Sequence, residues 1–154
     1  YKGIGKAQAI SIVAALDLGR RKRQAKALPD SGLSNSEEVF EFMQPRIGDL
    51  PHEEFWVIYL NNANRVVRTF QLSKGGITGT LVDVRLLIKE AVLVGAVSLI
   101  LSHNHPSGTL RPSEADRNIT GKIKIACDSM DIKVLDHLII TEKSYFSFKD
   151  EGIL

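Results

Sequence analysis

The sequence predicts an α/β fold in which one mixed β-sheet is flanked by helices. Segments with helical periodicity and segments with strand character are interleaved without strict alternation along the 154 residues. The segment 97–102 is short and almost entirely apolar, which is typical of a strand buried on both faces of its sheet. The length and the 44% hydrophobic content indicate one folded domain with a short appendage.

The N-terminal segment predicts a basic helix. A Gly3-Ile4-Gly5 turn precedes residues 7–21, whose apolar side chains recur every three or four positions without an interrupting proline. Residues 1–28 carry seven Lys and Arg against one Asp, a charge of +6, whereas the other 126 residues carry 13 basic and 17 acidic side chains. We therefore expect the two parts of the chain to meet different partners.

A linker and a second helix follow. Turn-forming residues predominate over 26–35, and the linker is placed at 29–35. The second helix is expected to begin with Ser34 as its N-cap, because Glu37 three residues later would complete a capping box. It is expected to end near Pro45. Its apolar face is formed by Val39, Phe40 and Met43.

The middle of the chain predicts a β-hairpin. Residues 55–60 are apolar, aromatic and β-branched, and the Asn-rich turn 61–64 connects them to a partner strand over 65–72. After a Lys-Gly-Gly break, residues 77–82 are expected to form a third strand.

The second half of the chain predicts further helices and strands. Asp83 is suited to cap a helix that runs to about Val94. The remaining expected elements are the buried strand 97–102, a helix over 113–128 and strands over 132–141 and 145–148.

Composition excludes several classes of protein. Cys127 is the only cysteine, which excludes an internal disulfide framework and a cysteine-based zinc cage and suits a reducing compartment. The most apolar stretch, 81–101, is interrupted by four charged residues, so no membrane span is expected. The N-terminus shows no secretory pattern. We therefore expect a soluble cytoplasmic protein.

The residues that follow the buried strand predict a metal site. His103 and His105 are two residues apart on extended chain, so both imidazoles point to the same side. Asp116 lies eleven residues later, in the first turn of the next helix, and a strand end and the facing helix start can bring these three ligands together. Two imidazoles and one carboxylate leave one tetrahedral position open, as in a catalytic zinc site.

Hydrolysis at such a site needs a general base and an oxyanion donor. Glu53 and Glu54 precede the first strand of the hairpin, and only one of these neighbours can face the metal. Ser113 is the candidate donor, since its hydroxyl lies one turn before Asp116. From local physics alone, a helix cap and a first-turn acid explain Ser113 and Asp116 better than a catalytic role does. His137 lies in a predicted strand, where a structural role or support of a metal ligand is expected.

The full string from His103 to Asp116 matches H-x-H-x7-S-x-x-D, and this pattern resembles the JAMM metalloprotease motif of MPN-type domains. The variant His-Asn-His-Pro-Ser-Gly and the later Val-Leu-Asp-His resemble the bacterial RadC family over essentially the whole chain. The resemblance implies an MPN/JAMM-like, cytidine-deaminase-like α/β fold. It also implies a bacterial, cytoplasmic protein associated with DNA repair.

The resemblance also implies a role for each site residue. His103, His105 and Asp116 would ligate one Zn2+ ion, Ser113 would steady the tetrahedral intermediate and Glu53 would be the general base. The implied activity is hydrolysis of peptide or isopeptide bonds in an unknown protein or peptide substrate, through a zinc-activated water. Eukaryotic members of the wider class usually have Ser or Thr where this chain has Asn104, and that difference separates the chain from their ubiquitin-type substrates.

The N-terminal segment resembles the end of a helix-hairpin-helix, a motif that binds DNA phosphates through the backbone of a glycine turn. This resemblance makes Gly3, Gly5 and Lys6 candidate nucleic-acid contacts. RadC proteins have more sequence before this point, so residues 1–28 are expected to be the C-terminal part of the motif. Residues 36–154 are expected to form the MPN/JAMM-like metal-binding domain.

Two further functions compete with the hydrolase. The chain could be a DNA-associated binding or scaffold factor without turnover, which the basic segment favours. A zinc nuclease ranks last, because the motif lacks the cluster for a second metal.

Overall fold

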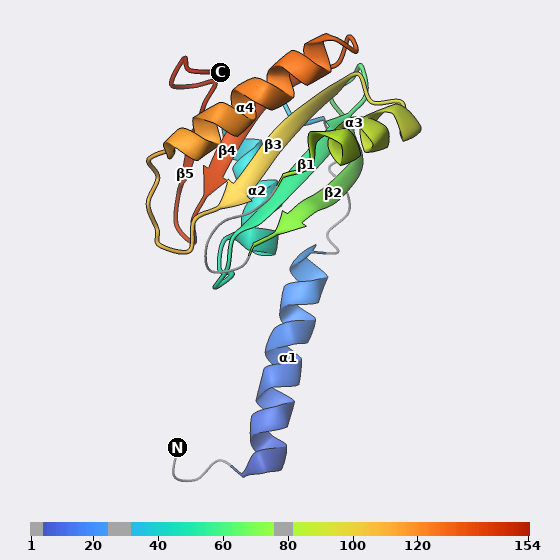
Figure 1. The fold of residues 1–154 in the computed structure, drawn as a ribbon. Coiled ribbons are helices and arrows are strands. Elements are labelled where there is room, and N and C mark those ends of the chain that lie inside the picture. Colours follow the sequence, from blue (N-terminus) through green and yellow to red (C-terminus); the bar gives the residue numbers. More distant parts are fainter. Residues whose placement is uncertain (1–4, 25–31, 76–81) are drawn as a thin grey trace.

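The computed structural model describes residues 5–24, 32–75 and 82–154. It contains one five-stranded sheet in the order β2-β1-β3-β4-β5, shown in Figure 1. The strands are β1 Glu54–Leu60, β2 Val66–Lys74, β3 Ser98–Asn104, β4 Lys133–Ile140 and β5 Tyr145–Ser147. Only β3 and β4 are parallel; the other neighbouring pairs are antiparallel. The α/β fold with a mixed sheet, predicted from the sequence, is confirmed.

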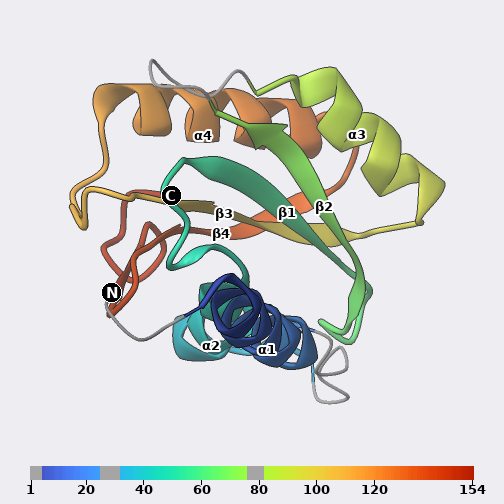
Figure 2. The same cartoon turned by 90° about the horizontal axis from the view of Figure 1, so that it is seen from below.

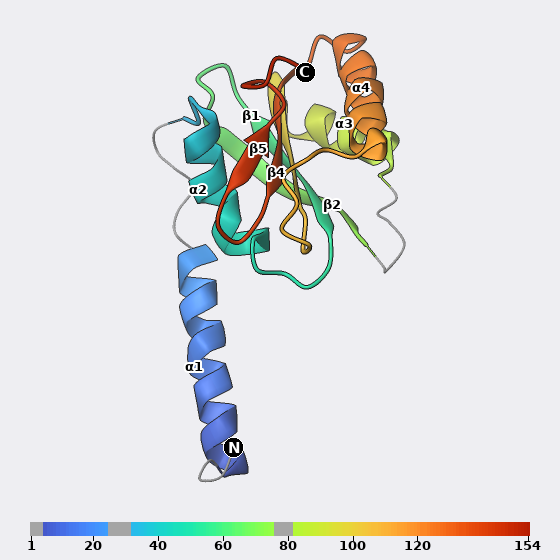
Figure 3. The same cartoon turned by 90° about the vertical axis from the view of Figure 1, so that its left-hand side faces the viewer.

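Helices cover both faces of this sheet. They are α1 Lys6–Gln24, α2 Ser36–Ile47, α3 Val84–Leu93 and α4 Glu114–Asp128. Figures 2 and 3 show α2 on one face and α3 and α4 on the other. Each face has its own apolar core: Met43 and Ile47 pack with Ile100 beneath α2, whereas Leu87 and Ile123 pack on the opposite side.

The central strand β3 is buried at all seven positions, as its apolar sequence predicts. Its side chains alternate between the two cores, so Leu99 and Leu101 join the core beneath α3 and α4, and Ile100 joins the core beneath α2. By the same alternation, His103 faces the layer of α4. The chain leaves β3, forms α4 and returns as the parallel strand β4, which places the start of α4 beside the end of β3.

Most predicted elements are present in the structure. These are the first helix, the hairpin, the Asp83-capped helix, the helix that follows Ser113, the buried strand and the last two strands. The strand expected over 77–82 falls on residues outside the described part of the chain, apart from Val82, which is not in a strand.

The start and the end of α2 differ from the prediction. Asn35 is the N-cap: its side chain accepts a hydrogen bond from the backbone N–H of Glu38 at 2.9 Å. The backbone N–H and the hydroxyl of Ser34 instead donate to the Glu38 carboxylate. Serine and asparagine are equally good caps, so the sequence did not distinguish them. The helix also continues past Pro45, because burial of Ile47 outweighs one missing N–H donor near the helix end.

Replacing the true cap is expected to destabilise the protein more than replacing its neighbour. Asn35→Ala removes the acceptor for the Glu38 N–H and should lower the free energy of unfolding by about 1 kcal/mol. Ser34→Ala should cost less, because the Ser34 hydroxyl accepts from no helix N–H: it donates to the Glu38 carboxylate and accepts from the Asn35 side-chain amide. Urea unfolding of the two variants measures both values, and a larger loss for Ser34→Ala would contradict this assignment.

The helix α1 extends away from the layers of the domain, as Figures 1 and 3 show. Its apolar side chains are largely exposed, with Val13 at 65% and Leu18 at 72%. Within the described residues, no helix combines the length and the hydropathy needed to cross a bilayer.

Candidate metal centre

The two histidines of the motif lie at the carboxyl end of β3. His103 pairs with Phe55 of β1 and with Ile139 of β4, so its backbone is held on both sides. The backbone N–H of His105 donates to Ile140 O at 3.0 Å, which extends the pairing just beyond the strand. Both imidazoles therefore lie at the rigidly held carboxyl end of the central strand and point to the same side.

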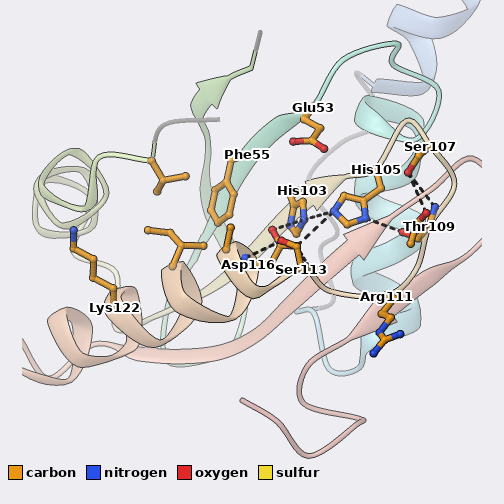
Figure 4. Close-up of a pocket in the computed structure, with 13 residues that line it drawn as sticks. Glu53, Phe55, His103, His105, Ser107, Thr109, Arg111, Ser113, Asp116 and Lys122 are labelled. Carbon is orange, nitrogen blue, oxygen red and sulfur yellow. Dashed lines mark hydrogen bonds and ion pairs between the residues drawn. The ribbon is translucent and has the colours of Figure 1, made fainter. Parts of the chain in front are cut away.

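Asp116 brings a carboxylate to these two rings from the first turn of α4. Nε2 of His103 lies 3.0 Å from Nε2 of His105 and 3.2 Å from Oδ1 of Asp116. Nε2 of His105 lies 3.6 Å from the other oxygen of the same carboxylate, Asp116 Oδ2. A tetrahedral zinc ion with bonds of about 2.0–2.1 Å has ligand atoms roughly 3.3 Å apart. The three side chains, shown in Figure 4, therefore converge with the spacing of a metal site.

The hydrogen bonding of the donor set also suits a cation. Nδ1 of His105 lies 2.7 Å from the carbonyl oxygen of Thr109. A carbonyl only accepts, so Nδ1 carries the proton, and a neutral His105 presents an Nε2 lone pair to the centre. The Asp116 carboxylate is likewise an acceptor. A lone pair and a carboxylate that meet at one point are stabilised by a positive ion, so the residues present fit a metal.

The electrostatics of the centre support the same conclusion. Burial opposes ionisation of Asp116, but the interactions with His103, His105 and Ser113 outweigh it and hold the pKa of the carboxyl well below its usual range. Burial also opposes charge on His105, yet the interactions with Asp116 and with the Thr109 carbonyl raise its pKa overall. The site thus keeps the carboxylate ionised and favours positive charge beside it.

Ser113 and Asp116 form a complete capping box at the start of α4. The backbone N–H and the hydroxyl of Ser113 donate to Asp116 Oδ2 at 2.7 and 2.6 Å, and the Asp116 N–H donates to Ser113 Oγ at 3.1 Å. The helix-cap interpretation is confirmed, and it is compatible with the ligand interpretation, because the cap orients the carboxylate. The Ser113 hydroxyl also lines the cavity above the centre.

The two neighbouring glutamates have different surroundings in the structure. Glu53 lines the cavity, and Figure 4 shows its carboxylate above the two histidines. Glu54 is 6% exposed and bonds elsewhere: its carboxylate accepts from Trp56 Nε1 and contacts His52 Nε2, both at 2.9 Å. Only Glu53 is therefore placed to act on a molecule in the cavity.

Asn104 anchors the segment that carries Glu53, a contact that sequence reasoning missed. Its side-chain oxygen accepts from the Glu54 N–H at 2.8 Å, and its amide donates to the His52 carbonyl at 2.9 Å. Asn104 points to the opposite face of β3 from the two histidines. The middle residue of the motif therefore ties the segment of the candidate base to the strand that carries the candidate ligands. The available signal was its position between the two histidines.

The centre opens into a cavity of about 690 Å3. Its apolar wall is formed by Phe55, Val82 and Ile119, and Lys122 and Arg111 lie at opposite ends in Figure 4. The cavity thus has room for a substrate segment rather than for an ion alone.

Sequence reasoning also missed Thr120, which lies with His137 behind the three candidate ligands. His137 is fully buried, and its ring nitrogens lie 2.8 Å from His103 Nδ1 and 2.6 Å from Thr120 Oγ1. Burial and the neighbouring His103 lower the pKa of His137 well below its ordinary value, which favours the neutral ring.

The candidate nucleic-acid residues are described only in part. Gly3 lies outside the described residues, whereas Gly5 and Lys6 are exposed at the start of α1. The Gly5 N–H bonds to the side chain of Gln8 at 3.0 Å. Contact of this segment with DNA stays a prediction.

Comparison with known proteins agrees with the fold and the motif. A family model described as the RadC-like JAB domain matches residues 33–153. The UPF0758 protein of Flavobacterium johnsoniae is 60% identical over 153 residues, which cover 99% of this chain and 67% of the relative. The UPF0758 protein of Porphyromonas gingivalis is 39% identical over 155 residues, covering 100% and 68%. That of Rubrobacter xylanophilus is 40% identical over 153 residues, covering 99% and 67%.

The sheet with helices on both faces, and the two histidines and aspartate at its edge, define a JAB-type α/β domain that can hold a metal ion. Within that class, the chain belongs to the RadC-like JAB domain family. It spans about two thirds of the length of these relatives.

Proposed function

We propose that this domain is a zinc-dependent hydrolase of peptide or isopeptide bonds. The observation that carries the proposal is the convergence of His103, His105 and Asp116, at tetrahedral spacing, on the floor of an open cavity whose wall includes Glu53. Three protein ligands leave one position for water or substrate, which is the composition of catalytic rather than structural zinc sites.

The residues of the site divide the work of hydrolysis. Zinc, when bound, supplies a Lewis acid that lowers the pKa of water and polarises a carbonyl. Glu53 takes the proton of the attacking water and returns it to the leaving amine. The Ser113 hydroxyl donates a hydrogen bond to the carbonyl oxygen of the substrate, where negative charge develops. This role requires the hydroxyl to rotate away from Asp116 Oδ2, its present acceptor. The apolar wall beside Phe55 orients the substrate and limits water.

The experiment that tests the proposal combines metal content with cleavage. The amount of zinc per protein molecule is measured by elemental mass spectrometry of the purified protein. Cleavage is measured on a quenched fluorescent peptide library and on a branched peptide with a lysine isopeptide bond. Bound zinc near one equivalent is expected, with cleavage that a chelator removes and added zinc restores. A protein without zinc, or cleavage that persists in the chelator, would contradict the proposal.

Zinc binding is expected to weaken as the pH falls. The pKa of His105 is raised, and a proton on Nε2 occupies the lone pair that the metal needs. Below that raised pKa, each pH unit should therefore cost about tenfold in affinity. Competition with a fluorescent chelator, calibrated at pH 8, 7 and 6, measures the effect, and an affinity that is independent of pH would exclude His105 as a ligand.

A further inference from the structure

A chain of buried hydrogen bonds runs behind the metal centre and ends on a metal ligand. It begins at the backbone carbonyl of Asp116, which accepts from the hydroxyl of Thr120 at 2.5 Å within α4. Thr120 Oγ1 lies 2.6 Å from Nδ1 of His137, and Nε2 of His137 lies 2.8 Å from Nδ1 of His103. Thr120, His137 and His103 are each at most 4% exposed, so water does not compete for these bonds.

The direction of each bond in the chain is determined by its first acceptor. A carbonyl oxygen only accepts, so the single hydroxyl proton of Thr120 points to Asp116 O. The bond between Thr120 and His137 must then use the N–H of His137 Nδ1. A neutral imidazole has one N–H, which leaves Nε2 of His137 as an acceptor. His103 therefore donates from Nδ1, and its Nε2 presents a lone pair to the metal centre.

Among the described residues, the ring nitrogens of His137 have hydrogen-bond partners only in Thr120 and His103. Its ring stacks on Phe148 with centroids 4.7 Å apart and contacts Phe55 at 5.4 Å. The nearby acid, Asp136, bonds to the backbone N–H of His137 and to Ser147 rather than to the ring. The tautomer of His137 is thus decided by Thr120.

We propose that Thr120 and His137 are positioning residues that hold His103 in the tautomer able to bind the metal. This inference rests on the proposed function, because it explains how the metal site is prepared. The arrangement also links two of the ligands to one another. The hydrogen bonds run from Asp116 in the first turn of α4, through His137 on β4, to His103 on β3.

The first test compares two substitutions of Thr120. Thr120→Val preserves the shape but removes the hydroxyl, and it should weaken zinc binding about 10- to 100-fold in chelator competition. Thr120→Ser keeps the hydroxyl and should bind zinc within a few-fold of the unsubstituted protein. Circular dichroism and thermal unfolding report whether each variant is folded. A folded Thr120→Val variant with unchanged zinc affinity would overturn the proposal.

The second test reads the tautomers directly and does not need a variant. Long-range 1H–15N NMR of the metal-free protein at pH 8 should show protons on Nδ1 of both His103 and His137. In Thr120→Val, His137 should move toward the Nε2–H form that free histidine prefers. A proton on Nε2 of His137 in the unsubstituted protein would overturn the proposal. A protein with the expected tautomers that binds no zinc would instead contradict the proposed function.

Discussion

Replacing Glu53 by glutamine is expected to abolish hydrolysis while zinc remains bound. Glutamine has nearly the same shape but cannot take a proton from water, and loss of a general base typically costs 10²- to 10⁴-fold in rate. Since Glu53 lines the cavity and is not one of the three converging ligands, zinc content should stay near one equivalent. The measurement is the rate of peptide cleavage together with metal content.

The matched control is Glu54→Gln. It removes the same charge from the neighbouring position, but Glu54 contacts His52 and Trp56 away from the cavity. Cleavage should stay within a few-fold of the unsubstituted rate, and the melting temperature should fall, because these partly buried contacts weaken. A large loss of activity in Glu54→Gln with none in Glu53→Gln would reverse the assignment of the base.

The second large effect is expected from Asp116→Asn, which should raise the zinc dissociation constant at least about 100-fold. Loss of a residue that only supports a metal ligand typically costs about 10- to 100-fold in affinity, and loss of a ligand itself should cost no less. The amide can still accept from Ser113 and cap α4, but it brings no negative charge to the two histidines. Chelator competition measures the constant, and cleavage should be lost in parallel.

Glu114→Gln controls for the charge itself. Glu114 is an exposed acid in the same first turn of α4, so its replacement removes the same interaction with the helix dipole. Zinc affinity and cleavage should be unchanged in this variant. Equal zinc affinity in the two variants would show that Asp116 is not a ligand.

Part of the site could be predicted because its spacing is local. Two histidines at i and i+2 on a buried strand must share a side, and an aspartate at the start of the next helix is brought back to that strand end. The cap of α2 could not be assigned in the same way, because Ser34 and Asn35 have equal propensity and only the contacts of Glu38 decide between them.

Other residues of the site depend on contacts between distant segments. Asn104 reaches the β1 segment about fifty residues away, and His137 meets Thr120 and His103 across β4, α4 and β3. No local pattern reports such pairs, since each residue taken alone is an ordinary polar side chain in a buried element. The same reason explains why the choice between Glu53 and Glu54 stayed open.

The sequence by itself therefore determined the α/β class, nearly all of the described elements and the three candidate ligands, because hydrophobic periodicity and short spacings act within one or two elements. Only the tertiary structure showed that Glu54 bonds away from the cavity, how Asn104 holds that segment and that Nδ1 of His103 lies against His137. Those properties depend on hydrogen bonds between strands and helices that come together only when the chain packs.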